Sequence, residues 1–149
     1  MANQHAILVA VNQSPASMEA VTAACTLAKQ RKAKVTVLHV IEVLRSLPLN
    51  AGLDSEMRKG EAVLRHAEER AGELGVQVTR ALVQAREAGP AIVEEGRDEH
   101  VDAIVLGLGY KRVTGSFEIG RTTDFVLKNA QSQVWVVRPA LTTNARGAE

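Results

Sequence analysis

Residues suited to binding phosphate gather in one stretch, residues 103–121, with the sequence AIVLGLGYKRVTGSFEIGR. Its apolar start, residues 103–106, is typical of a buried strand. Lys111 and Arg112 follow, before a helical pattern begins near Gly120. The stretch also holds four of the chain's eleven glycines: Gly107, Gly109, Gly115 and Gly120. Glycine lets the backbone approach a ligand closely, and the unpaired N–H groups at a helix start attract anions. This order of strand, loop and helix therefore indicates a phosphate site.

The rest of the chain must supply a scaffold for that loop, and its hydrophobic periodicity predicts five strands alternating with four helices. We expect the strands at residues 5–11, 34–43, 76–83, 103–106 and 133–138. We expect the helices at residues 16–31, 54–74, 89–100 and 120–130, with Ser14 as N-cap of the first, Met57 on the buried face of the second and Gly75 at its end. This alternation predicts an α/β, Rossmann-like fold: a doubly wound, five-stranded parallel sheet with helices on both faces. The half-polar third strand is typical of an edge.

Composition sets limits on the class of protein. The 149 residues fit one domain, residues 1–138, followed by a polar and flexible tail, residues 139–149. The net charge of +1 gives no field that favours nucleic acid. A single cysteine, Cys25, excludes an intrachain disulfide and suits a reducing compartment. No apolar run approaches the length of a membrane span and the first residues lack a signal peptide, so we expect a cytoplasmic protein without membrane insertion.

Ligands of doubly wound sheets bind outside the carboxyl ends of strands, where the strand order reverses. Two predicted strand ends carry suitable residues. Val11 and Asn12 close the first strand, and Gly107 follows the fourth. We therefore expect the site between these two ends.

Several familiar reaction centres are absent from the sequence. The GxxxxGK[ST] loop and the GxGxxG fingerprint are both missing, as is a GxSxG nucleophile elbow. We nominate no catalytic residue and expect at most weak nucleotide hydrolysis. His39 has no second histidine or cysteine at ligand spacing, so we interpret it as a hydrogen-bonded core residue and expect no protein-held metal. A phospho-receiver domain would need acidic residues where Asn12 and Gln84 stand.

Three segments together resemble the universal stress protein family: ILVAVNQSPAS, VTVLHVIE and IVLGLG with GRTTDFVLKNAQSQVWVVR. The resemblance covers residues 6–138 as a single copy. The nucleotide-binding branch of that family has glycine, two residues, glycine, nine residues, glycine, then Ser or Thr. Gly107 and Gly120 match the first and third glycines. Tyr110, beside Gly109, stands at the second, and Arg121 stands at the Ser/Thr.

The resemblance implies further site residues. The family's Asp that faces the nucleoside is Asn12 here, and Val40 matches the backbone position beside the adenine. Asn12 retains hydrogen-bonding capacity but lacks a carboxylate. Tyr110 adds bulk near the phosphates, or its ring could stack on a base. Arg121 opposes the helix dipole by roughly 0.3–1 kcal/mol, which suggests a partner: a phosphate, or a carboxylate such as Glu118 or Asp124.

The resemblance leads us to expect a regulatory protein that binds an adenine nucleotide (ATP, ADP or AMP) without fast turnover; Mg²⁺ is left open. The expected site residues are Val11, Asn12, Val40, Gly107, Gly109, Tyr110, Lys111, Gly120, Arg121 and Thr122. Because three signature positions have changed, an alternative is a member that binds no nucleotide and acts on a protein partner, such as a transporter or a stress protein. An enzyme of the adenine-nucleotide α-hydrolase type is the last alternative. Such enzymes carry a serine- and glycine-rich pyrophosphate loop after the first strand, whereas residues 12–16 contain no glycine.

The resemblance also implies a homodimer that pairs through the last strand, residues 133–138. Trp135 lies in that strand, and the sequence leaves two roles open for it. It is either a core residue or an anchor of the interface.

Overall fold

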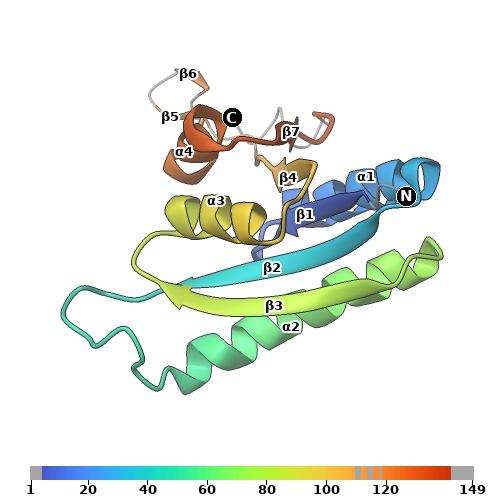
Figure 1. The fold of residues 1–149 in the computed structure, drawn as a ribbon. Helices are drawn as coiled ribbons and strands as arrows, with labels where there is room; N and C mark the ends of the chain where they lie inside the picture. Colours follow the sequence, from blue (N-terminus) through green and yellow to red (C-terminus); the bar gives the residue numbers. More distant parts are fainter. Residues whose placement is uncertain (1–4, 110–111, 114–115, 118, 142–149) are drawn as a thin grey trace.

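The computed structural model describes residues 5–109, 112–113, 116–117 and 119–141 of the chain. Five strands form one parallel sheet: β1 (Ala6–Ala10), β2 (Lys34–Glu42), β3 (Val78–Ala85), β4 (Ala103–Gly107) and β7 (Gln133–Val137). Their order is β3-β2-β1-β4-β7 (Figure 1). The doubly wound parallel sheet predicted from the sequence is confirmed, and β3 is an edge strand as expected.

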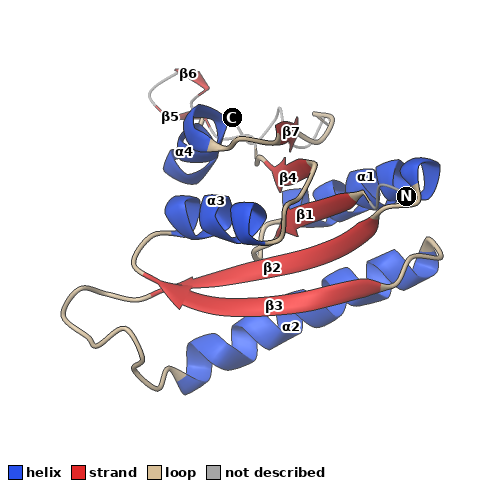
Figure 2. Ribbon diagram, in the orientation of Figure 1, coloured by secondary structure: helices blue, strands red, loops and turns tan. Residues whose placement is uncertain are grey.

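Four helices cover the sheet: α1 (Pro15–Arg31), α2 (Asp54–Glu73), α3 (Ala88–Asp98) and α4 (Arg121–Asn129). The first two pack on one face and the last two on the other (Figure 2). The chain changes faces between α2 and α3. The strand order accordingly reverses between β1 and β4, which lie side by side.

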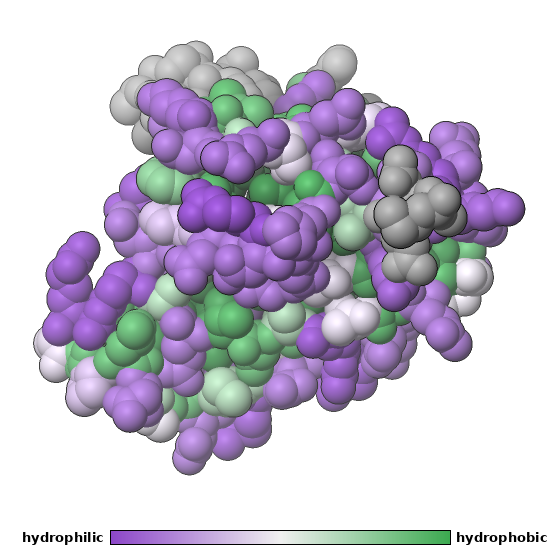
Figure 3. All heavy atoms as spheres, in the orientation of Figure 1, coloured by the Kyte–Doolittle hydropathy of each residue, from purple (hydrophilic) through white to green (hydrophobic). Residues whose placement is uncertain are grey.

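Each sheet face has its own hydrophobic core because side chains alternate along a strand. Val9 and Val105 point toward α1 and α2. Leu8 and Ile104, their neighbours in sequence, pack with α3 and α4. Burial on both faces explains the continuous apolar runs of β1 and β4. Hydrophilic side chains cover most of the face seen in Figure 3, with smaller hydrophobic patches between them.

The helix boundaries follow recognisable signals. Ser14 caps α1, its hydroxyl oxygen accepting the N–H of Ala16 at 3.2 Å, and Pro15 opens the helix as expected. At the end of α2, Gly75 has a φ of +79°, a value that favours glycine. The next N–H, of Val76, donates to the carbonyl of Ala71 at 2.9 Å. This bond satisfies one of the last carbonyls of the helix.

Two details differ from the sequence prediction. The loop after β4 is not wholly irregular, because β5 (Arg112–Val113) pairs antiparallel with β6 (Ser116–Phe117). Met57 was expected on the buried face of α2 but is 37% exposed. The reason is that the helix first meets the sheet one turn later, at Gly60, which lies against His39 and Leu82. Residues 142–149 of the expected tail lie outside the described residues.

Candidate functional site

The adjacent carboxyl ends of β1 and β4 form the floor of the candidate site. Ala10 pairs in register with Leu106, so the residues after them, Val11 and Gly107, emerge at the same edge of the sheet. The N–H of Val11 donates to the carbonyl of Leu38 on β2 at 2.8 Å. The two chain segments that the sequence nominated are therefore brought together.

Asn12 is held in place by α1. Its side-chain oxygen accepts the N–H of Ser14 at 2.8 Å and the hydroxyl of Ser17 at 3.0 Å. The N–H of Ser14 can only donate, so the atom facing it must be the amide oxygen rather than the nitrogen. The amide nitrogen of Asn12 is thus the polar atom left for a ligand. Sequence reasoning missed Ser17, whose role depends on the fold of this turn.

An inner cavity of about 120 Å³ opens above the strand ends. Val11, Asn12, Val40, Gly107 and Thr122 are five expected site residues that line it. Apolar side chains of both sheet and helix complete the lining, among them those of Leu38, Ile92 and Leu106. A small recess that combines apolar side chains with several polar groups suits a flat ring that carries hydrogen-bonding atoms.

His39 supports this cavity from below. Its Nδ1 lies 2.8 Å from the carbonyl oxygen of Val11. Because a carbonyl only accepts, Nδ1 carries the proton. The bond holds Val11 against β2, in agreement with the interpretation of His39 as a hydrogen-bonded core residue. The described residues contain no group of three or more potential metal-binding side chains.

An outer cavity of about 320 Å³ adjoins the inner one. Six expected site residues line it: Asn12, Gly107, Gly109, Gly120, Arg121 and Thr122. The two cavities share Asn12, Gly107, Thr122 and Thr123. All eight expected residues that the structure describes therefore line one cavity or the other. Tyr110 and Lys111 lie outside the described residues.

All four helices begin at this edge of the sheet, and their first turns differ. The hydroxyl of Ser14 caps α1, and a carboxylate oxygen of Glu42 accepts the N–H of Ala88 at the start of α3 at 2.8 Å. The N-cap of α4 is Gly120, which has no side chain to accept a hydrogen bond. The first turns of α2, whose N-cap is Leu53, and of α4 therefore lack a side-chain cap, and the first turn of α4 borders the outer cavity.

Arg121 opens α4 and lines the outer cavity. One of the carboxylates considered as its partner, Asp124, instead pairs with Lys128 at 3.1 Å. Glu118, the other, lies outside the described residues. The exposed guanidinium of Arg121 is thus placed where an anion in the outer cavity would meet it.

Gly107 and Gly120, the two anchor glycines that match the family signature, have different physical roles. A Cβ at Gly107 would collide with the carbonyl of Ala16, so glycine is needed there for α1 to pack on β4. A Cβ at Gly120 would meet no atom of the described residues within 4 Å. Gly120 is therefore not required by packing, which leaves room for a role at the open helix end.

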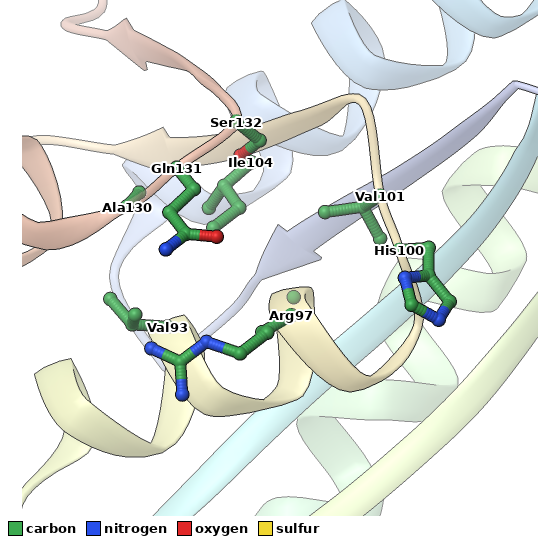
Figure 4. A pocket seen from close by; sticks show the side chains of 9 residues that line it. Val93, Arg97, His100, Val101, Ile104, Ala130, Gln131 and Ser132 are labelled. Atoms are coloured by element: carbon green, nitrogen blue, oxygen red, sulfur yellow. The ribbon is translucent and has the colours of Figure 1, made fainter.

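A third cavity, of about 300 Å³, lies at the opposite end of the sheet (Figure 4). Ile104 and Val93 form part of its apolar wall, and the side chains of Arg97 and Gln131 face the same opening while His100 points away. None of the expected site residues lines it.

Within the part of the chain that the structure describes, no helix is long and apolar enough to cross a membrane.

Comparisons with known proteins identify the family and the fold of this chain. The sequence model of the universal stress protein family matches residues 4–138. Universal stress protein MJ0531 of Methanocaldococcus jannaschii is 30% identical over 138 residues, which cover 89% of this chain and 81% of that protein. The structure of universal stress protein UspA from Lactobacillus plantarum is similar with a TM-score of 0.72, at 22% identity, over 93% of this chain and 100% of that one.

Several of the similar structures contain nucleotides. The universal stress protein from Archaeoglobus fulgidus in complex with dAMP has a TM-score of 0.70 at 18% identity, over 91% of this chain and 98% of that one. A universal stress protein family protein from Arabidopsis thaliana with AMP bound has a TM-score of 0.65 at 16% identity, over 95% and 98%. At these identities the likeness shows the fold alone.

Proposed function

This chain belongs to the universal stress protein family, and from that premise we propose that it binds an adenine nucleotide where β1 and β4 end. The observation that carries the proposal is the junction of the two cavities at Asn12, Gly107, Thr122 and Thr123. The inner cavity would take the base and the outer one the phosphates. Nucleotides bound to proteins of the same fold support this assignment.

The polar groups are distributed as a nucleotide requires. The inner cavity beside Val40 would hold the adenine ring against the side chains of Leu38 and Ile92. The amide nitrogen of Asn12 would then lie between base and phosphates, where ribose oxygens would accept from it. The uncapped N–H groups of α4 and the cation of Arg121 would hold phosphate. No nucleophile or general base is nominated at the site, so the protein would retain the nucleotide as a regulatory ligand.

Thermal unfolding with ATP, ADP, AMP or cyclic AMP, each with and without Mg²⁺, tests the proposal. A nucleotide at 100 times its dissociation constant should add ~2.7 kcal/mol to the free energy of unfolding. For a chain of this size the unfolding midpoint would rise by roughly 5–11 °C. No rise with any nucleotide would contradict the proposal.

The site is tested by Gly120→Asp. Aspartate is a favoured N-cap, and the position has space for it, so the fold should be as stable or more stable. Its carboxylate would occupy the N–H groups of α4 and repel phosphate, so nucleotide binding should be lost. Gly120→Ala is the matched control and should still bind. Unchanged affinity in Gly120→Asp would contradict the site.

A second part of the proposal concerns location and assembly. The single cysteine, Cys25, is buried and free, which suits the reducing cytoplasm. A homodimer would form through β7, an edge strand whose Trp135 is 41% exposed. If no nucleotide binds, the alternative is a module that acts on a protein partner, and the exposed side chains of Leu127 and Trp135 are the features that favour it.

A further inference from the structure

Glu42 is a carboxylate on the phosphate side of the candidate site. It ends β2 and lines the outer cavity together with Gly109, Gly120 and Arg121. Sequence reasoning did not single it out, because one exposed acid at a strand end resembles any other surface charge. Its position in the cavity comes from the parallel register, which brings the end of β2 to the same edge as β1.

The Glu42 side chain is held by α3. One carboxylate oxygen accepts the N–H of Ala88 at 2.8 Å, at the first turn of that helix. The charge is favourable there because it faces the positive end of the helix dipole. The second oxygen has no hydrogen-bond partner among the described residues. The carboxylate is therefore fixed at one end and open toward the cavity at the other.

Among the described residues, no cation forms an ion pair with Glu42. Arg121 lines the same cavity, yet the two side chains do not form an ion pair within 4 Å. A di- or triphosphate entering the cavity would thus meet a fixed negative charge. Repulsion between like charges weakens binding, and the effect grows with the number of phosphate charges.

A divalent cation would remove this conflict. Mg²⁺ is commonly held by one or two carboxylates together with the phosphates of a ligand, and it keeps several of its waters. We propose that the free oxygen of Glu42 and the nucleotide phosphates share a divalent cation, so that binding of polyphosphates depends on Mg²⁺. The inference rests on the proposed nucleotide site. It adds a divalent cation and names Glu42 as the protein residue that binds it.

Titration calorimetry of ATP in Mg²⁺ or in EDTA tests the inference on the wild type and on Glu42→Gln. The glutamine oxygen still accepts the Ala88 N–H, so α3 should remain folded, and the unfolding midpoint checks this. The wild type should bind ATP about tenfold more tightly with Mg²⁺ than with EDTA. In Glu42→Gln the affinity in EDTA should rise and most of the gain from Mg²⁺ should disappear. AMP should show a smaller gain in the wild type.

Glu87→Gln is the matched control. Glu87 is the N-cap residue of α3, directly before Ala88, and does not line the outer cavity. This variant should keep the wild-type dependence on Mg²⁺. As a second readout, Mn²⁺ paramagnetic resonance should show the ion immobilised by wild type with ATP and more weakly by Glu42→Gln.

The outcomes separate the two proposals. An equal gain from Mg²⁺ in wild type and Glu42→Gln would overturn the role of Glu42 while leaving the nucleotide site intact. Equal binding with and without Mg²⁺ in the wild type would do the same. Absence of ATP binding under every condition would overturn both.

Discussion

The backbone N–H of Asn12 donates to the hydroxyl of Ser17 at 2.8 Å, and that hydroxyl donates back to the Asn12 side-chain oxygen at 3.0 Å. Ser17 is 3% exposed, so water does not replace it. The closed pair fixes the turn between β1 and α1. Because Asn12 lines both cavities, the shape of the candidate site depends on a hydroxyl in the first turn of a helix.

Ser17→Ala should lower the free energy of unfolding by about 1–3 kcal/mol, because the N–H of Asn12 loses its acceptor in a half-buried turn. Nucleotide affinity should fall as well. Urea unfolding measures the first effect. Thr26→Ala is the control on the same helix: Thr26 is exposed and bonds only the carbonyl of Thr22, so its loss should cost less than about 0.5 kcal/mol. Equal losses in both variants would contradict the role of Ser17.

The meeting of Asn12 and Gly107 could be predicted from the sequence, because parallel strands of a doubly wound sheet share one carboxyl edge. The anchoring of Asn12 could not, since it depends on a side chain five residues later that the turn brings back. Glu42 gave no signal for a similar reason: its place in the cavity follows from strand register, and its type is common on any surface.

Gly107 shows how a motif residue can have a structural reason of its own. The sequence analysis associated it with close approach of a phosphate. In the structure its missing Cβ makes room for the carbonyl of Ala16, on the protein's own helix. Packing between α1 and β4 therefore explains this glycine without any ligand, while Gly120 has no such explanation.

Substituting alanine at each anchor glycine should separate these roles. Gly107→Ala should destabilise by more than about 2 kcal/mol, because backbone atoms of α1 must move. Gly120→Ala should cost no more than about 1 kcal/mol, since the space is open and only the N-cap preference changes. Chemical denaturation of the two variants side by side gives the comparison. A Gly120→Ala loss as large as that of Gly107→Ala would contradict it.

Stability should depend on pH through Glu95. A hydrogen bond with Glu99, together with partial burial and the charges of Glu99, Asp98 and Glu94, raises the pKa of Glu95 from 4.5 to about 7. The folded state therefore favours the protonated acid. This contribution to the free energy of unfolding is full below about pH 4.5 and is lost as the pH rises through about 7.

Glu95→Gln should remove that loss, because an amide donates to Glu99 at every pH. The variant should be more stable than wild type at pH 8, by less than about 1 kcal/mol since the group is largely solvated. Urea midpoints from pH 5 to pH 8 measure the difference. Glu94→Gln removes a neighbouring charge and should keep most of the pH dependence. An unchanged slope in Glu95→Gln would contradict the assignment.

Trp135→Asp should convert the proposed homodimer to a monomer. The outer edge of β7 has no strand beside it among the described residues. Trp135, whose indole N–H donates to Gln133 at 3.1 Å, is 41% exposed on a face of the sheet next to that edge. Burying such a ring against a partner chain that pairs with this edge would anchor an interface, and a carboxylate would prevent it. Sedimentation velocity measures the mass, against 16.0 kDa for one chain. Leu44→Asp is the control, since Leu44 is 70% exposed beyond β2 on the other half of the sheet and should leave the dimer intact. If the Trp135→Asp variant remains a dimer, Trp135 does not anchor the interface.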